Sequence, residues 1–482
     1  MRPEMMTMNR LFLLPVVAAV LSACNLTPDY KPPAMDVPPA FKEAALWKPA
    51  DPAAVPAVPD AWWTLFNDPE LDRLETQAAG ANPTLQGAVA AFRIAQAAVA
   101  TSEAALYPTV GLNGTGTRSV TGSTSAGTVD ASGNPVGSSS GKPRNTYSVS
   151  ASASWELDLW GRLSATVDAS QARAVASADD LAASRLSIQA TLAQTYFSLR
   201  AADAQLALLD DTIAAYQRSL DLTRNRYRAG VASSADVSQA ETQLYSTQAQ
   251  RIESATSRAQ LEHALAVLTG QAPAAFSLPA GKLPEAPALP QQLPSELLQR
   301  RPDIAAAERR VAAANAQVGV ARAAFFPSLT LSGSAGYRSS TLNDIISSPN
   351  LFWSFGPALA LSVFDGGARR AAVASARATV DQAAATYRST VLTALQEVED
   401  NLVAGANLEQ ERAVQLQALA SARKALDVAN NQYKAGIVSY LNVVTAQSSV
   451  LSSERSVLDV RNRRLAAVNT LLKNIAGRWQ QG

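Results

Sequence analysis

The sequence predicts an α+β protein of two structural repeats, each with a helix, a β-hairpin, a very long helix, a turn and a second helix. Three observations predict this fold. The segments 225–237 (NRYRAGVASSADV) and 431–443 (NQYKAGIVSYLNV) share a Tyr-x-x-Gly pattern. Long stretches that contain almost no Pro or Gly flank both segments. Each long stretch is preceded by residues that alternate between apolar and polar, as in β-strands.

Residues 1–23 have the features of an export signal peptide. Arg2 and Arg10 supply positive charge, and the apolar segment 11–20 is too short to span a bilayer as a helix. The signal ends in Leu-Ser-Ala-Cys, which resembles a bacterial lipobox, so Cys24 is expected to be the lipidated N-terminus of the mature chain. An ordinary signal peptide with a chance cysteine is the alternative. Cys24 is the only cysteine, so no disulfide competes for it.

The residue after Cys24 bears on the destination of the lipoprotein. In sorted bacterial lipoproteins, which this segment resembles, Asp at that position commonly retains the protein at the inner membrane. Asn25 stands there instead, so delivery to the outer membrane is expected. Each buried methylene of an acyl chain contributes about 0.8 kcal/mol, so a multiply acylated cysteine anchors the chain firmly.

Two Pro-rich segments divide the mature chain. The first is the lipid-bearing arm, 24–69, and the second is a linker, 271–294. Because Pro lacks a backbone N–H and has a fixed φ, the Pro-rich stretch from residue 25 to about residue 60 is expected to be extended, without helix or central strand. Repeat 1 is accordingly expected over 70–270 and repeat 2 over 295–477, followed by a tail, 478–482.

Four Pro or Gly residues of repeat 1 recur in repeat 2 at nearly constant separation. The separation is 219 residues before the first hairpin and 205 or 206 residues after it. The Ser- and Gly-rich insert 113–146 explains the change, and it is expected to be a loop insertion in repeat 1. The matched pairs are Pro83 and Pro302, Pro108 and Pro327, Gly161 and Gly366, and Gly230 and Gly436.

The hairpins contain apolar residues at every second position. This alternation is strict over 147–159 and recurs over 329–337 and 351–363. Strands of about ten residues suit a tilted transmembrane β-strand, and a soluble two-sided sheet is the alternative. Two hairpins give four strands per chain, whereas the smallest membrane barrels have about eight. A membrane-embedded sheet therefore requires several chains, because open edges are not tolerated in lipid.

The longest predicted helix covers 162–226, which contains neither Pro nor Gly. Apolar residues recur at every seventh position, which predicts a coiled-coil seam, and about 1.5 Å per residue gives a length of roughly 100 Å. Its counterpart is 368–429. Shorter antiparallel helices, 235–269 and 438–476, follow the two glycine-containing turns. These turns are therefore expected at the far tips of two helical hairpins. A coiled coil exposed to solvent is the alternative. The seam residues are Leu192, Leu199, Leu206, Ile213, Leu220 and Tyr227.

The composition argues against enzymatic and metal-dependent chemistry. The chain of 482 residues has one Cys and one His, so neither a Ser-His-Asp site nor a Cys/His metal site is expected, and no cofactor is expected. His263 is interpreted as a core residue or one facing a helix dipole. A formal net charge of +1 gives no indication of binding to nucleic acid. The chain is not expected to be an enzyme.

Six motifs resemble those of the TolC/OprM-type outer-membrane factors, specifically the NodT-like branch of outer-membrane efflux lipoproteins. They cover nearly the whole mature chain in family order. The resemblance implies a homotrimer whose twelve strands form one outer-membrane β-barrel and whose twelve helices form a coiled-coil periplasmic barrel. The motifs are WWTLFNDPELDRL (62–74), SWELDLWGRL (154–163), LLQRRPDIAAAERRV (297–311), FFPSLTLSG (325–333), ALQEVEDNLVA (394–404) and NQYKAG (431–436).

The same resemblance implies a passive exit duct for drugs or other small toxic compounds. Such ducts dock onto a periplasmic adaptor (membrane fusion) protein and an inner-membrane pump, commonly of the RND type, which supplies the energy. Three alternatives remain open: a structural coiled-coil lipoprotein of the envelope, a duct for polypeptide secretion and a duct for metal-ion export.

A periplasmic gate at the tips is also implied by the resemblance. Asp236 matches an Asp that constricts the opening in family members, and Tyr433 matches a Tyr that holds the closed state by hydrogen bonding. Asn442 stands at the second-repeat position, where relatives carry Asp. A helix-start role explains Asp236 equally well, because a carboxylate there is worth about 0.3–1 kcal/mol. Gly230 and Gly436 are expected to supply positive φ at exposed turns suited to adaptor docking.

Overall fold

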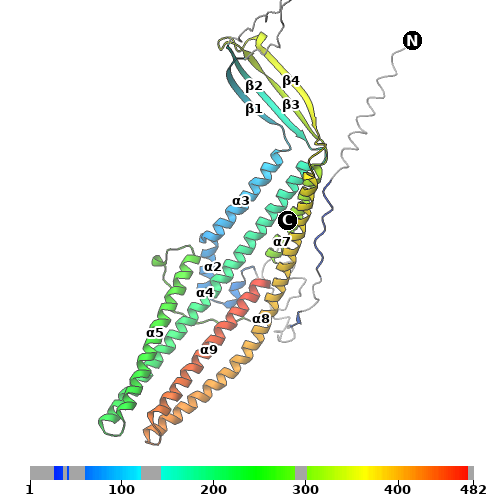
Figure 1. Ribbon diagram of the computed structural model, residues 1–482. Coiled ribbons are helices and arrows are strands. Elements are labelled where there is room, and N and C mark those ends of the chain that lie inside the picture. The colour runs from blue at the N-terminus through cyan, green and yellow to red at the C-terminus, as the bar shows by residue number, and fades with distance from the viewer. Residues whose placement is uncertain (1–25, 36–40, 43–59, 121–142, 288–300, 476–482) are drawn as a thin grey trace, which may run out of the picture. The chain divides into compact units, whose positions relative to one another are not determined.

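The computed structural model describes residues 26–35, 41–42, 60–120, 143–287 and 301–475 (Figure 1). The predicted signal peptide and Cys24 lie outside the described residues. The chain divides into two compact units, which are treated separately below. Unit 1 comprises Met1–Pro32, Ile94–Ala174 and Arg309–Ala383, and unit 2 comprises Pro33–Arg93, Val175–Glu308 and Ala384–Gly482.

The two halves of the chain share one series of elements in the same order. In each half a 22-residue helix is followed by two strands, a 67-residue helix and a return helix of 35 or 36 residues. This correspondence bears out the repeated element order. The first half contains η2 (Trp62–Phe66), α2 (Pro69–Ala81), α3 (Pro83–Ala104), β1 (Thr109–Ser119), β2 (Arg144–Leu157), α4 (Arg162–Arg228), α5 (Ser234–Leu268) and η3 (Pro273–Ala275). The second contains α7 (Pro302–Ala323), β3 (Ser328–Ser339), η4 (Ser348–Asn350), β4 (Leu351–Ala360), α8 (Ala368–Lys434) and α9 (Tyr440–Ile475).

Local signals in the sequence set several helix starts. Asn82 is extended, and its side-chain oxygen accepts a hydrogen bond from the Leu85 N–H, so the helix breaks between α2 and α3 as Pro83 predicts. Asp158 accepts hydrogen bonds from the first N–H groups of α4. Asp365 does the same for α8 and also accepts one from the Arg369 side chain, which lowers the pKa of Asp365 to about 2.

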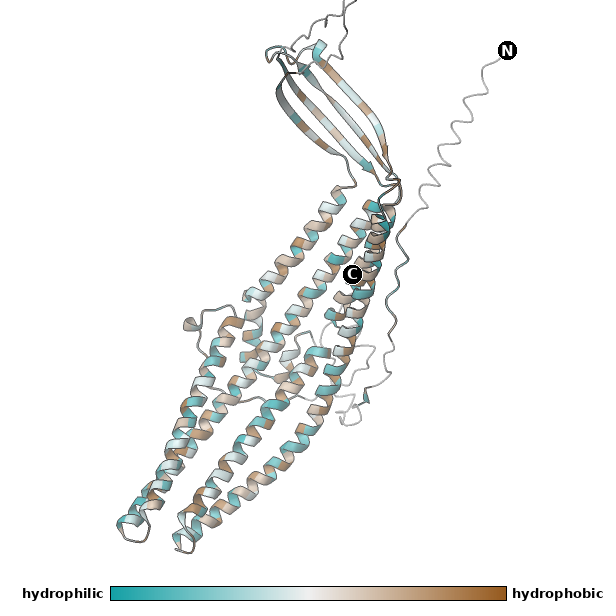
Figure 2. Cartoon of the chain, in the orientation of Figure 1, coloured by the Kyte–Doolittle hydropathy of each residue, from teal (hydrophilic) through white to brown (hydrophobic). Residues whose placement is uncertain are grey.

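The four strands form one antiparallel sheet in chain order. The register places Leu112 opposite Ala151, and Leu331 opposite both Trp155 and Pro357, on a single apolar face. Hydroxyl groups line the opposite face. They include the pair Thr115 and Ser148, whose oxygens are 2.7 Å apart, and the pair Ser334 and Ser354, 2.9 Å apart. The predicted alternation is therefore present, and it is visible along the strands in Figure 2.

The strand limits differ from the sequence prediction at three places. β2 ends at Leu157, not at residue 159, because Asp158 turns to cap α4. β4 ends at Ala360, not at residue 363, and its last pairing is with Ser328, next to Pro327, which has no N–H to extend the ladder. The insert 113–146 is not a loop throughout, because residues 113–119 belong to β1 and residues 144–146 to β2. Residues 121–142 of the insert lie outside the described residues.

Three of the six predicted seam residues of α4 are buried, and Leu206 and Ile213 are half-buried. Leu192, Leu199 and Leu220 have exposed fractions of at most 1%. The prediction is wrong for Tyr227, which is 50% exposed, because the seam runs out at the hairpin tip, where α4 ends one residue later. His263 is also exposed rather than part of the core, since Leu265 and Ala266 bury the other side of α5. Among the described residues, no helix is both long enough and apolar enough to cross a bilayer.

Candidate functional site at the hairpin tips

The tips of the two helical hairpins of unit 2 share one apolar core. α4 and α5 are joined by the turn 229–233, and α8 and α9 by the turn 435–439. Buried side chains from both hairpins pack together, so separating the tips would expose this core to water. Its members are Tyr216, Leu220, Ala240 and Leu244 from the first hairpin, and Ala429, Tyr433, Tyr440, Val443 and Val444 from the second.

Arg226 joins the two tips across this core. Its guanidinium lies 4.7 Å from the centroid of the Tyr433 ring, within cation–π range. Its Nη1 also donates a hydrogen bond of 3.2 Å to the carbonyl of Lys434, the last residue of α8. A cation at this helix C-terminus is favoured by the negative end of the helix dipole. Arg226 was not among the site residues predicted from the sequence, although a basic residue in the last turn of α4 was a usable signal.

Tyr433 is buried, as the tip core requires, but its contacts differ from the hydrogen bond that the resemblance implies. Its hydroxyl has no hydrogen-bond partner among the described residues. Its ring lies 5.3 Å from the ring of Tyr440, whose hydroxyl is 3.0 Å from the Ser219 oxygen on α4. Burial raises the pKa of Tyr440, and the hydrogen bond with Ser219 acts in the opposite direction. Tyr440 therefore provides a side-chain hydrogen bond between the hairpins within the tip core.

Asp236 forms a reciprocal capping box at the start of α5. Its carboxylate accepts hydrogen bonds of 2.9 Å from both the N–H and the hydroxyl of Ser233. The Ser233 oxygen in turn lies 3.2 Å from the Asp236 N–H, which donates to it. This geometry establishes the helix-start role that was one of the two interpretations of Asp236.

The other predicted site residues lie on the surface of the tips. Gly230 and Gly436 have φ values of 77° and 78°, as expected for turn glycines, and both are exposed. Asn442 is exposed in the first turn of α9. No hydrogen bond joins the Asn442 side chain to Asp236 or Tyr433 in the described part of the chain. The structure thus brings Tyr433 and Tyr440 together and leaves Asn442 apart.

Above the tip core, the two hairpins enclose a polar cleft of about 850 Å³. Gln205 and Gln243 line it from the first hairpin, and Ser448, Arg455 and Asn462 line it from α9. Gln243 donates a hydrogen bond of 3.2 Å to Ser448, and Arg455 donates one of 3.1 Å to Gln250. The apolar tip and this polar stretch give the inner faces of the hairpins different affinities for water.

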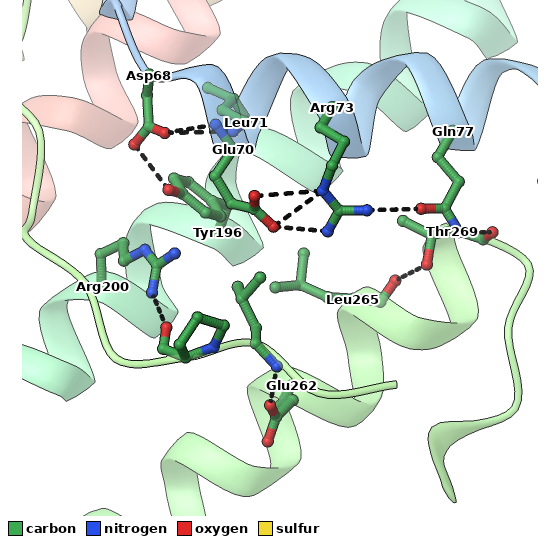
Figure 3. Close-up of polar contacts among 12 residues, drawn as sticks. Asp68, Glu70, Leu71, Arg73, Gln77, Tyr196, Arg200, Glu262, Leu265 and Thr269 are labelled. Atoms are coloured by element: carbon green, nitrogen blue, oxygen red, sulfur yellow. Dashed lines mark hydrogen bonds and ion pairs between the residues drawn. The ribbon is translucent and has the colours of Figure 1, made fainter. Parts of the chain in front are cut away.

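A buried ionic cluster fixes the connection after α5. Asp203 on α4 accepts hydrogen bonds of 3.0 Å from Arg200, from Arg258 and from the N–H of Gly281. Arg200 also donates to the carbonyl of Pro279 at 2.7 Å (Figure 3). A Cβ on Gly281 would lie 2.6 Å from the Arg200 Cζ, so a side chain there would displace the guanidinium. Residues 271–287 are therefore held against α4 and α5, with no helix beyond the short η3.

Helix α4 also contacts the start of α2, through Tyr196. The Asp68 carboxylate accepts hydrogen bonds from the N–H groups of Glu70 and Leu71, and a 2.7 Å bond from the Tyr196 hydroxyl of α4 (Figure 3). Across the described residues there is no group of three or more His, Cys, Asp or Glu side chains placed to hold a metal ion.

Sequence comparison identifies the family. The family model described as outer membrane efflux protein matches residues 74–271 and 293–477, which is well over half of the chain. The chain belongs to the outer membrane efflux protein family. The resemblance drawn from the sequence motifs is thereby confirmed, and so is the outer membrane as the location.

Two relatives and one solved structure show how far the similarity of this outer membrane efflux protein extends. The toluene efflux pump outer membrane protein TtgC of Pseudomonas putida is 31% identical over 476 residues, which are 98% of this chain and 96% of TtgC. The cation efflux system protein CusC of Escherichia coli is 31% identical over 483 residues, 97% of this chain and 99% of CusC. The outer-membrane channel OprN superposes with a TM-score of 0.84 at 30% identity, over 94% of this chain and 99% of OprN.

Proposed function

We propose that this protein is one protomer of a homotrimeric exit duct in a tripartite efflux system. In this proposal β1–β4 form one third of a shared outer-membrane barrel, and the long helices form one third of a coiled-coil periplasmic barrel. Cys24 is acylated and anchors the arm 24–69 to the same membrane. In the same proposal, repeat 1 covers residues 70–270, the linker 271–294 and repeat 2 295–477.

The open sheet is the observation that carries this proposal. β1 and β4 are its edges, and neither has a second strand partner among the described residues. The apolar face leaves Leu112, Trp353 and Phe355 between 72% and 82% exposed in the single chain. Four strands with free edges are too few to close in lipid, whereas three copies supply the twelve that the resemblance implies.

The proposed duct is passive and depends on partners for energy. The exposed turns at Gly230 and Gly436 are the surface offered to a periplasmic adaptor protein. An inner-membrane pump of the RND type drives transport. The duct itself contributes a path and a gate, and no enzymatic step is assigned to it.

The proposed gate consists of Asp236, Tyr433 and Asn442 at the tips, with Arg226 holding the two hairpins of each chain together. Only Asp236 of the first repeat carries a carboxylate at the gate position, because the second repeat has Asn442 there. A ring of three carboxylates, one from each chain, would then constrict the opening.

Single-channel conductance in planar bilayers tests the gate. The double variant Asp236→Ala with Tyr433→Ala should raise the conductance of the purified protein several-fold, because it removes the carboxylate ring and part of the tip core. Ser233→Ala is the matched control, because it weakens the capping box by about 1 kcal/mol while keeping the Asp236 charge. Equal conductance of the double variant and the unchanged protein would refute the gate. Purified protein that never conducts would instead favour a structural envelope lipoprotein.

The cargo is proposed to be small toxic compounds, with cation export as the second candidate. TtgC and CusC are equally similar to this chain, yet one is named for toluene and the other for cations. A strain that lacks the gene distinguishes the two. We expect lost tolerance to drugs or solvents with unchanged metal tolerance, and the reverse result would favour cation export.

A further inference from the structure

Helix α7 holds the backbone of the segment that follows the signal peptide. The Asn315 Nδ2 donates a 2.7 Å hydrogen bond to the carbonyl of Pro28, and the Arg322 Nη1 donates one of 3.4 Å to the carbonyl of Leu26. The two donors are seven residues apart on α7, so they lie on one face two turns apart. The segment and residues 309–323 of α7 belong to unit 1.

Gly319 lies between these donors, on the same face of α7. A Cβ at position 319 would lie 2.3 Å from the Thr27 Oγ1 and 2.9 Å from the Thr27 Cα, which real Cβ atoms essentially never show. Part of that contact is with backbone, so a side-chain rotation of Thr27 cannot relieve it. The absence of a side chain at Gly319 is therefore what allows the segment to approach the helix so closely.

This contact places Leu26 beside the end of α7. Leu26 follows Cys24 by two residues, which span at most about 7 Å. The carbonyl of Leu26 is held by Arg322, one residue before the end of α7, and β3 begins at Ser328. Phe325 and Phe326, between helix and strand, are 41% and 38% exposed. Aromatic side chains are typical of the level at which a membrane protein meets the headgroups.

We propose that Asn315, Gly319 and Arg322 form a seat that holds residues 26–28 and so fixes the acyl chains of Cys24 beside the α7–β3 junction, where they enter the periplasmic leaflet of the outer membrane. The inference rests on the proposed function, because it requires an acylated Cys24 and a membrane-embedded sheet. The seat sets the lipid anchor and the end of the barrel at the same depth.

Maleimide labelling of the acylated protein, purified from outer membranes, tests the seat. Cys24 is the only cysteine, and its acylated sulfur cannot react, so Thr27→Cys introduces a single reactive thiol. This thiol should label slowly, because the seat shields it. Adding Gly319→Ala should accelerate labelling at least about tenfold by populating the released segment.

Gly87→Ala is the matched control, because Gly87 is also a helix glycine but its added Cβ would meet nothing within 4 Å. Both changes gain the same helix propensity, so only the contact with Thr27 differs. Asn315→Ala serves as a second variant if Gly319→Ala fails to accumulate. It should also accelerate labelling, because it removes the bond to Pro28.

Equal labelling rates in the Gly319→Ala, Asn315→Ala and Gly87→Ala backgrounds would overturn the seat. If Cys24 is not acylated, the result differs, because the protein without Thr27→Cys would itself react with maleimide at Cys24. Peptide masses separate labelling at residue 24 from labelling at residue 27. The ratio of rates at residue 27 then still decides whether the seat exists.

Discussion

At the residue scale, Glu75 on α2 is the least expected side chain. It is 0% exposed, and neither of its carboxyl oxygens has a hydrogen-bond partner among the described residues. Burial, and to a smaller extent the nearby Asp72, raises the pKa of Glu75 from 4.5 to about 9. At neutral pH the carboxyl is therefore protonated in the folded protein and ionised in the unfolded chain.

This difference predicts that Glu75→Gln stabilises the protein at neutral pH. The contribution of Glu75 to the free energy of unfolding is complete below pH 4.5 and is lost as the pH rises towards 9. The stability of the unsubstituted protein should therefore fall across this window. At pH 7, keeping the Glu75 carboxyl protonated in the folded protein lowers the free energy of unfolding by at most about 3 kcal/mol. Thermal unfolding from pH 5 to 9 should show a higher midpoint for Glu75→Gln, with the difference growing as the pH rises. Glu253→Gln, at an exposed site, should leave the profile unchanged.

The contacts of Arg226 with Tyr433 and Lys434 give a second prediction at this scale. Lys keeps the charge but loses the planar group that stacks on Tyr433 and the donor to the Lys434 carbonyl. Arg226→Lys should therefore lower the local stability of the tip by about 0.5–2 kcal/mol. The backbone amides of residues 429–443 should then exchange hydrogen several-fold faster. Arg218→Lys, at an exposed position on the same helix, is the control. Unchanged exchange in Arg226→Lys would show that the apolar core alone holds the tips together.

At the element scale, the ends of helices and their connections carry the specific interactions. Asp158, Asp365 and Asp236 each accept a backbone N–H hydrogen bond with a carboxylate at the start of a long helix. The connection after α5 depends instead on the buried cluster around Asp203, whose side chain is 3% exposed. Such a cluster contributes order to a segment that has almost no regular structure.

Breaking this cluster should be costly. Asp203→Asn removes the charge that compensates Arg200 and Arg258, and loss of one partner of a buried ion pair typically costs about 3–5 kcal/mol. The variant should unfold at a lower temperature and become sensitive to protease within 271–287. Asp210→Asn breaks only the exposed pair with Arg251 and should cost about 1 kcal/mol or less. Similar melting temperatures for the two variants would contradict the assigned role of Asp203.

At the scale of the whole molecule, the sheet and the hairpins both have surfaces that one chain does not cover. Within the described part of the chain, the sheet has two unpaired edges and an exposed apolar face, and the tips expose Tyr227 and Ile437. Large apolar surfaces of this kind normally meet lipid or another protein.

The proposed assembly predicts a mass of three mature chains in mild detergent. Light scattering with correction for bound detergent measures this mass directly. The mature chain should in addition carry the mass of the acyl groups on Cys24. A monomer of folded chains would contradict the shared barrel, because the edges of β1 and β4 would then remain open in lipid.

The sequence by itself determined the local structure. Alternation predicted β2, β3 and β4, whereas most of β1 fell in the expected loop insert. Heptads and the absence of Pro and Gly predicted α4, and the repeat predicted its counterpart α8. Turn glycines predicted the positive φ at Gly230 and Gly436. These features depend on period and backbone sterics, which neighbouring residues encode. Six motifs were sufficient to recognise the family.

Only the tertiary structure decided which side chains meet. Arg226 and Tyr433 are 207 residues apart in the chain, and Asn315 binds a carbonyl 287 residues away. Burial of Glu75 and exposure of Tyr227 likewise follow from what packs against each helix, and not from the helix itself. A sequence pattern defines the face that a residue occupies. Which partner covers that face depends on long-range packing, because contacts between distant segments leave no local period in the sequence.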